Sequence, residues 1–182
     1  ACIPCIFALI FQASHQDAMT QVIGFAIFGL SLVLLYGAST IYHTLYVSEA
    51  KTILLRRIDH IMIFVLIAGT YTPICLVSLA GPWGWTMLAL IWILAIGGAV
   101  MKIFWIQAPR WLSTSLYIIM GWLAVIAFVP LQRAVSWDGV GLLLAGGLAY
   151  TVGAIIYGLK KPNLALAGFG FHEIFHIFVM IG

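Results

Sequence analysis

Long apolar stretches, separated by short polar connections, dominate the chain. A helix needs roughly 20 apolar residues to cross the hydrocarbon core of a bilayer. Five stretches are long enough, at about 22–43, 58–79, 84–105, 112–130 and 139–158. Two further apolar stretches lie at the ends, at residues 1–12 and 171–182. Because a helix rises about 1.5 Å per residue, these stretches are too short to cross more than part of the bilayer. The pattern predicts an all-α, polytopic membrane protein with one seven-transmembrane-helix domain over residues 1–182, whose first and last helices are clipped in this sequence.

The composition agrees with this interpretation. Hydrophobic residues make up 64% of the 182 residues and charged residues only 7%, whereas soluble domains carry roughly 25% charged residues. The chain is basic, with a pI of about 8.9, but its cations follow the expected membrane topology instead of forming a patch that would suit nucleic acid. We therefore expect no nucleic-acid partner.

The basic residues also predict the orientation of the chain in the membrane. Seven of the eight Lys and Arg residues fall in or beside the connections after the second, fourth and sixth expected helices: Lys51, Arg56, Arg57, Lys102, Arg110, Lys160 and Lys161. Only Arg133 falls on the other side. Because cytoplasmic loops are enriched in Lys and Arg, we expect the N terminus in the cytoplasm and the C terminus outside, in a multi-pass protein of the cell (plasma) membrane.

A proline interrupts the third expected helix at the end of the run GTYTP, residues 69–73. Proline lacks a backbone N–H and cannot continue the hydrogen-bond ladder. We therefore expect a kink at Pro73, with the neighbouring threonine hydroxyls satisfying the carbonyls that it frees. An alternative is that this point is a hinge that opens a path for a substrate.

Polar residues gather at one end of the expected bundle. His43 closes the second helix, and Ser39 lies four residues earlier on the same face. Asp59 opens the third helix, while His172 and His176 open the seventh. Ionisable side chains are costly at membrane depth unless they have a partner, and a catalytic zinc ion takes about three protein ligands and a water. Because the expected topology brings the three histidines and Asp59 to the same, cytoplasmic level, with Ser39 one turn away, the pattern predicts a metal site inside the bundle.

Each of these residues taken alone has a simpler explanation. A single histidine at a helix end, such as His43, is typical of the membrane interface. Asp59 could pair with Arg56 or Arg57, or favour the positive end of the helix dipole. The histidine pair of the last helix is more specific, because two imidazoles four residues apart form a ready bidentate site. The combination favours a metal site over the separate explanations.

The last apolar stretch also contains the pattern H-E-x-x-H, from His172 to His176. In zinc proteases of this pattern the glutamate, here Glu173, is the general base. An intramembrane protease would need a third ligand from elsewhere. Asp138 falls on the outer side, a membrane thickness away, and the use of Asp59 would leave the polar residues of the second helix without a role. The protease interpretation is therefore the weaker one.

Together these motifs resemble the hemolysin III family, which belongs to the progestin and adiponectin receptor superfamily of seven-helix proteins. The resemblance covers about residues 36–182 and depends on four motifs: Ser39-x-x-x-His43, Arg57-Ile58-Asp59-His60, the GTYTP run and His172-x-x-x-His176. It implies that three histidines bind zinc near the cytoplasmic side, namely His43, His172 and His176. It also implies that Asp59 and Ser39 lie close to the zinc-bound water. The resemblance gives Glu173 no role.

Such a site suits hydrolysis of a membrane lipid amide or ester, as in a ceramidase-like hydrolase. Zinc held by imidazoles activates water near neutral pH, Asp59 would accept and return the proton, and Ser39 would orient the water or polarise the carbonyl. Two other functions stay open. One is cytolysis, or hemolysis, by permeabilising a membrane, although no polar stripe runs along any expected helix. The other is a membrane sensor or regulator in which the zinc is structural.

Overall fold

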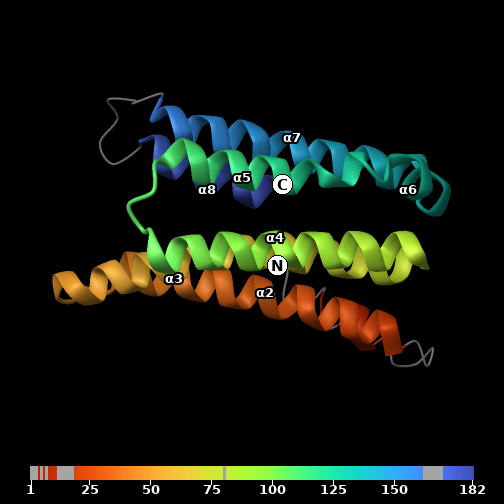
Figure 1. The fold of residues 1–182 in the computed structure, drawn as a ribbon, viewed down its shortest axis with the longest axis horizontal. Helices are drawn as coiled ribbons and strands as arrows, with labels where there is room; N and C mark the ends of the chain where they lie inside the picture. Colours follow the sequence, from red (N-terminus) through yellow and green to blue (C-terminus); the bar gives the residue numbers. More distant parts are fainter. Residues whose placement is uncertain (1–3, 5, 7, 12–18, 80, 162–169) are drawn as a thin grey trace. The chain divides into compact units, whose positions relative to one another are not determined.

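The computed structural model describes residues 4, 6, 8–11, 19–79, 81–161 and 170–182. Within these residues the regular structure is helical, and no strand occurs. In chain order the elements are α2 (Met19–Thr44), α3 (Glu49–Pro73), the π-helix η1 (Ile74–Ser78), α4 (Pro82–Phe104), α5 (Arg110–Trp122), the 3-10 helix η2 (Leu123–Val125), α6 (Phe128–Ala134), α7 (Trp137–Leu159) and α8 (Phe171–Ile181), as Figure 1 shows. The expectation of an all-α protein is confirmed.

Four of these elements are long and apolar enough to cross a membrane: α2, α3 with η1, α4 and α7. A fifth span results if the pair Arg110–Val125 and Phe128–Ala134 is counted as one, although the two parts are bent by 59°. The expected continuous helix over 112–130 is therefore wrong in its middle. α8 is a shorter apolar helix. Of the expected first span, residues 4, 6 and 8–11 are helical, and the remainder lies outside the described residues.

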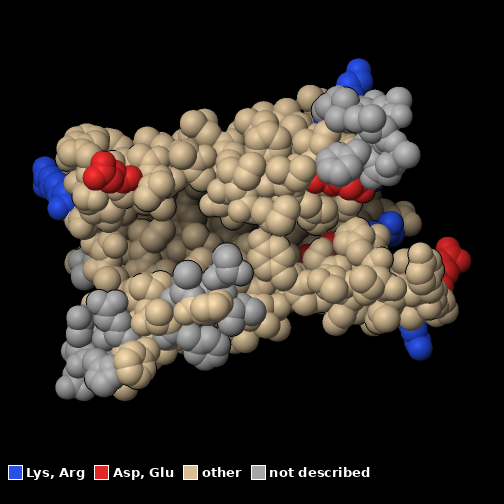
Figure 2. Space-filling view, turned by 180° about the vertical axis from the view of Figure 1, so that it is seen from behind, with Lys and Arg blue, Asp and Glu red and all other residues tan. Residues whose placement is uncertain are grey.

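The helix surfaces carry large apolar side chains that a soluble protein would bury. Ile93 of α4 is 66% exposed and Leu142 of α7 is 75% exposed. In Figure 2 residues other than Lys, Arg, Asp and Glu make up most of the visible surface, and the visible charged side chains are few. Apolar lipid tails accept such a surface. Helices can lie among them because each helix satisfies its own backbone hydrogen bonds. The chain is a polytopic membrane protein.

The chain forms two compact units, Ala1–Ile106 and Gln107–Gly182. In the first unit α3 packs against both α2 and α4. Gly98 of α4 faces the fully buried ring of Phe64, where an added Cβ would clash. Gly69 of α3 likewise faces the Ser31 side chain of α2. Small residues at these two positions let the helices approach closely, as is usual within membranes.

The third span begins earlier than the hydropathy pattern predicts. α3 starts at Glu49, so Lys51, Arg56 and Arg57 lie on the helix, and their expected place in a loop is wrong. Asp59 likewise lies ten residues into α3, about 15 Å along its axis, instead of opening it. The physical reason is that Glu, Lys and Arg, which fill much of this segment, are good helix formers. Hydropathy registers only the part of the helix that lies in hydrocarbon.

At Pro73 the third span changes from α to π winding, and η1 continues it to Ser78. Thr72 is buried, donates a hydrogen bond to the Ala68 carbonyl at 2.8 Å and accepts one from the indole N–H of Trp92 at 3.2 Å. The π-helix has more residues per turn than the α-helix, and this change of winding accommodates the backbone N–H donor that Pro73 lacks. The hinge interpretation of Pro73 stays a prediction.

In the second unit α7 packs against α5 and α8. Gly153 of α7 lies against Phe178 of α8, where an added Cβ would come within 2.8 Å of the phenylalanine Cβ. Trp122, the last residue of α5, donates a hydrogen bond from its indole N–H to Thr151 of α7 at 2.9 Å. The hydrogen bond joins α5 to α7, and the Gly153 contact packs α8, which carries the histidine pair, against α7.

Candidate metal centre

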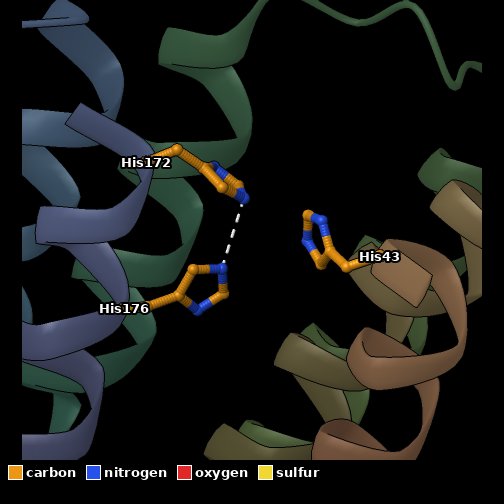
Figure 3. Close-up of side chains that lie close together, drawn as sticks. All are labelled: His43, His172 and His176. Atoms are coloured by element: carbon orange, nitrogen blue, oxygen red, sulfur yellow. Dashed lines mark hydrogen bonds between the residues drawn. The ribbon is translucent and has the colours of Figure 1, made fainter. Parts of the chain in front are cut away.

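His172 and His176 lie in the first two turns of α8, one turn apart. Their Nε2 atoms are 3.2 Å apart, and their rings meet edge to face with centroids 4.7 Å apart (Figure 3). Two nitrogen ligands at 2.0–2.1 Å from a tetrahedral zinc ion are about 3.3 Å apart. The two imidazoles therefore have the separation that a shared zinc ion requires, and this part of the predicted site fits the metal.

An aromatic cluster surrounds the histidine pair. Tyr157, near the end of α7, has its ring centroid 5.9 Å from that of His172, 5.0 Å from that of Phe175 and 6.3 Å from that of Phe171. The guanidinium of Arg110, the first residue of α5, lies 5.5 Å from the Tyr157 ring and 5.9 Å from the Phe171 ring. Such cation–π contacts stabilise the packing of aromatic faces. Three helices are thus joined at the end of the second unit where the histidine pair lies.

Sequence reasoning missed the part that Tyr157 and Arg110 play. Arg110 figured only as a charge that indicates topology, and Tyr157 did not figure at all. The available signal was weak: both flank connections on the expected cytoplasmic side. Their contact with the histidine helix depends on packing between helices that are far apart in the chain.

The side chain of Glu173 caps the N-terminal end of α8. Its carboxylate accepts a hydrogen bond from the backbone N–H of Gly170 at 2.7 Å, the reciprocal half of a capping box. The sequence signal for this role was weak, because the N-cap residue Gly170 lacks the side chain of the usual Ser/Thr-x-x-Glu capping box. A carboxylate bound to the helix start is a poor candidate for a general base, so the structure favours a structural role for Glu173.

Asp138 lies far from the histidine pair within the second unit. It stands in the first turn of α7, nineteen residues before Tyr157 and therefore about 28 Å away along the helix. Tyr157 is the α7 residue in contact with His172. The expectation that Asp138 is too distant to be a third ligand is confirmed.

Ser39, His43 and Asp59 belong to the first unit. His43 lies in the last turn of α2, is exposed and has its ring 4.7 Å from that of Tyr42; Figure 3 labels it on this helix. Ser39 is half-buried one turn earlier. In the antiparallel pair of α2 and α3, Ser31 lies against Gly69. The same number of residues separates Ser39 from Ser31 on α2 as separates a position close to Asp59 from Gly69 on α3. Ser39 and Asp59 therefore lie at the same level of this helix pair to within about one turn.

Asp59 is paired with a histidine and not with an arginine. Its Oδ2 atom lies 3.9 Å from Nδ1 of His60, and its side chain is 14% exposed. The same Nδ1 atom lies 2.6 Å from the backbone carbonyl of Arg56. The alternative in which Asp59 pairs with Arg56 or Arg57 is therefore wrong. The helix-dipole alternative is also wrong, because that effect falls off within the first turn and Asp59 stands well beyond it.

Comparison with known proteins yields one family over the whole chain. The family model described as haemolysin-III related matches residues 1–182. Hemolysin-3 of Bacillus cereus is 43% identical over 180 residues, which cover 99% of this chain and 79% of that protein. The Hemolysin-3 homolog of Bacillus subtilis (strain 168) is 44% identical over 177 residues, or 97% and 79% of the two chains. The monocyte to macrophage differentiation factor of Homo sapiens is 26% identical over 160 residues, or 84% and 63%. No solved structure matches.

Proposed function

This chain belongs to the haemolysin-III related family, and on that premise we propose that it binds one zinc ion through His43, His172 and His176. The zinc site would lie at the cytoplasmic side of the membrane and serve the hydrolysis of a lipid amide or ester. The observation that carries the proposal is the 3.2 Å separation of the Nε2 atoms of His172 and His176. It matches the separation of about 3.3 Å for two imidazoles on one tetrahedral zinc ion.

The two ligands on α8 are supported from several directions. Glu173 caps the start of the helix, and Tyr157 packs against both His172 and the neighbouring Phe175. Ligands whose side chains are held in place bind a metal more tightly than mobile ones. His43 is the proposed third ligand because it is an exposed imidazole in the last turn of α2, one turn from Ser39.

The chemistry that a three-histidine zinc ion supplies is a water of pKa about 7, acidic enough to lose its proton at neutral pH. Asp59 would accept that proton on a carboxylate oxygen and later donate it to the leaving nitrogen of an amide. The products are a carboxylic acid and an amine, so the proton and the water are both accounted for. Ser39 would donate a hydrogen bond to the substrate carbonyl. The Asp59 side chain is only 14% exposed, and its part in the proposal requires that the proton lie within hydrogen-bond reach of its carboxylate.

A membrane lipid is the proposed substrate class because of where these residues lie along the helices. The distribution of Lys and Arg supports a cytoplasmic N terminus and an external C terminus in the plasma membrane. In that orientation the C-terminal end of α2 and the start of α8 would face the cytoplasm. An amide or ester at the boundary between the polar and acyl parts of a lipid lies at this depth.

Metal content tests the proposal. The full chain, purified in detergent without chelators, is expected to hold about one zinc ion by elemental analysis. The double variant His172→Ala, His176→Ala should lose it. His60→Ala is the matched control, because it removes an imidazole that is not a proposed ligand and should keep the zinc. Absence of metal from the unaltered protein would overturn both the zinc site and the hydrolase.

A second candidate function is cytolysis, which the name of the Bacillus cereus relative suggests. Leakage of a dye from vesicles that contain the purified protein measures it directly. Leakage that persists in the zinc-free double variant would favour cytolysis over hydrolysis. Zinc that is present while no lipid amide or ester turns over would instead favour the third candidate, a membrane sensor or regulator with structural zinc.

A further inference from the structure

Three polar side chains share one face at the start of α5. Arg110 is the first residue of this helix, and Ser113 and Thr114 follow it three and four residues later. Residues with this spacing are neighbours on a helix surface, and helical side chains slope back toward the N-terminal end of their helix. We name these three residues the α5 polar face. None of them is a proposed metal ligand.

Contacts with α7 place this face inside the second unit. The Arg110 guanidinium lies 5.5 Å from the centre of the Tyr157 ring. Thr114 lies against the next residue of α7, Gly158, where an added Cβ would be 3.8 Å from the Thr114 hydroxyl oxygen. Arg110 and Thr114 therefore contact neighbouring positions of the same helix. Their proximity follows from helix packing as well as from their spacing on α5.

Both hydroxyl groups of the α5 polar face are buried without a hydrogen-bond partner. Ser113 is 4% exposed and Thr114 is 6% exposed, and neither hydroxyl has a partner among the described residues. A buried hydroxyl that makes no hydrogen bond costs free energy. Other helical threonines avoid this cost, because seven of them donate to the carbonyl four residues earlier: Thr40, Thr44, Thr52, Thr70, Thr72, Thr86 and Thr151. The two hydroxyls of α5 indicate a partner from outside the fold.

The charges at this end of α5 favour an anion. Arg110 is exposed and stands at the positive end of the helix dipole. The first turn of α5 holds no acidic residue, and no side chain caps it. Glu173 of α8 accepts the Gly170 N–H and forms no ion pair with Arg110 among the described residues. A guanidinium, two hydroxyls and the first N–H groups of a helix are donors typical of a phosphate site.

Two ordinary explanations account for part of this arrangement. Arginine is frequent at the cytoplasmic ends of membrane helices, and here its cation–π contacts with Tyr157 and Phe171 stabilise packing. Serine and threonine are frequent as helix caps. The N-cap of α5 is Pro109, however, and Ser113 and Thr114 lie beyond the first turn. Neither explanation provides a partner for the two buried hydroxyls.

We propose that the α5 polar face binds the phosphate group of a phospholipid. A tetrahedral phosphate has oxygens in several directions, so it can accept hydrogen bonds from the planar fork of Arg110 and from both hydroxyls. Inorganic phosphate has the same chemistry. Trp111, the residue after Arg110, is 66% exposed and typical of headgroup depth, which favours a lipid as the source of the phosphate. The site requires neither zinc nor hydrolysis and so goes beyond the proposed function.

Lipid titration of the detergent-purified full chain, followed by native mass spectrometry, tests the proposal. The probes are phosphatidylglycerol and a diacylglycerol with the same acyl chains, which lacks the phosphate. We expect one phosphatidylglycerol to bind in preference to diacylglycerol. Arg110→Gln and Thr114→Val should each weaken this binding at least about tenfold, because each removes a donor to a charged group. Arg133→Gln is the matched control: it removes an exposed arginine from the same unit and should leave binding unchanged.

Thermal stability separates a ligand site from a structural role. Without lipid, Thr114→Val should have a Tm at least as high as that of the unaltered protein, because it removes a buried hydroxyl without a partner. Thr151→Val should instead lower the Tm, since the Thr151 hydroxyl donates to the Gly147 carbonyl and accepts from the Trp122 indole. Phosphatidylglycerol should raise the Tm of the unaltered protein more than that of Thr114→Val. If Arg110→Gln fails to fold, Arg110→Lys keeps the charge, loses the planar fork and should still bind more weakly.

Several results would overturn the proposal. Equal binding of phosphatidylglycerol and diacylglycerol would exclude a phosphate site, and an equal loss in Arg133→Gln would show that only the general positive charge matters. Displacement of phosphatidylglycerol by millimolar inorganic phosphate would exclude the lipid as the source of the phosphate. Full lipid binding by Thr114→Val together with a lowered Tm would give Thr114 a structural role. Zinc content of Thr114→Val should equal that of the unaltered protein, so failure of this site and failure of the zinc proposal are distinguishable.

Discussion

The Nε2 atoms of His172 and His176 lie 3.2 Å apart on successive turns of α8. This relationship leads to a prediction about metal removal. Substitution of either histidine by alanine should weaken zinc binding by more than about 100-fold, because loss of a residue that merely supports a ligand already costs 10–100-fold. Titration of zinc against a coloured chelator measures the change. His60→Ala should bind zinc as the unaltered protein does. Retention of full affinity in both single variants would exclude α8 as the metal-binding helix.

Tyr157 is expected to position the metal ligands through its ring. Tyr157→Ala removes the contacts with His172 and Phe175, so zinc affinity should fall about tenfold. Tyr157→Phe keeps the ring and should restore most of the affinity. The visible absorption spectrum of the cobalt-substituted protein gives an independent readout of ligand geometry. If the phenylalanine variant is as weak as the alanine variant, the hydroxyl and not the ring carries the effect.

Glu173 offers a choice between two roles. As a helix cap, it needs only an oxygen that accepts the Gly170 N–H, so Glu173→Gln should keep zinc and lipid turnover. Glu173→Ala removes the cap and should lower the Tm of the protein. A general base would behave differently, because a glutamine cannot accept a proton. Loss of turnover in Glu173→Gln with zinc retained would restore the H-E-x-x-H protease-like role.

Asp59→Asn tests whether the zinc is catalytic. The asparagine keeps the size of the side chain but cannot act as a base, so turnover of a lipid amide should fall by at least about 100-fold. Zinc content should be unchanged, since Asp59 is not a proposed ligand. His60→Ala, which removes the 3.9 Å partner of Asp59, should keep the greater part of the activity. Unaltered turnover in Asp59→Asn would leave the zinc with a structural role.

Thr72 is expected to stabilise the π-helical segment of the third span. Thr72→Val removes the acceptor of the Trp92 indole N–H and the donor to the Ala68 carbonyl. Loss of such hydrogen bonds should lower the free energy of unfolding by about 1–3 kcal/mol. Unfolding in mixed detergent measures it. Thr72→Ser keeps both bonds and should be close to the unaltered protein. In the background of Trp92→Phe, which has no indole to satisfy, Thr72→Val should cost less.

Hydropathy predicted most of the spans well because the bilayer imposes a length on each helix. The expected 84–105 became Pro82–Phe104, and the expected 139–158 became Trp137–Leu159. The hydropathy prediction failed where charged residues lie on a helix that continues beyond the hydrocarbon, as in the first turns of α3. Hydropathy also failed after η2, between Val125 and Phe128, where the two parts of the span are bent by 59°, because average hydropathy contains no direction.

By itself the sequence determined the membrane class, the family motifs and the histidine pair. The pair could be read because two residues four apart on one helix are neighbours whatever surrounds them. Tertiary structure alone decided that Tyr157 and Arg110 join the histidine helix to α5 and α7. It also decided that Lys102 is buried. Such features depend on which helices pack together, and an apolar stretch facing lipid is indistinguishable in hydropathy from one facing another helix.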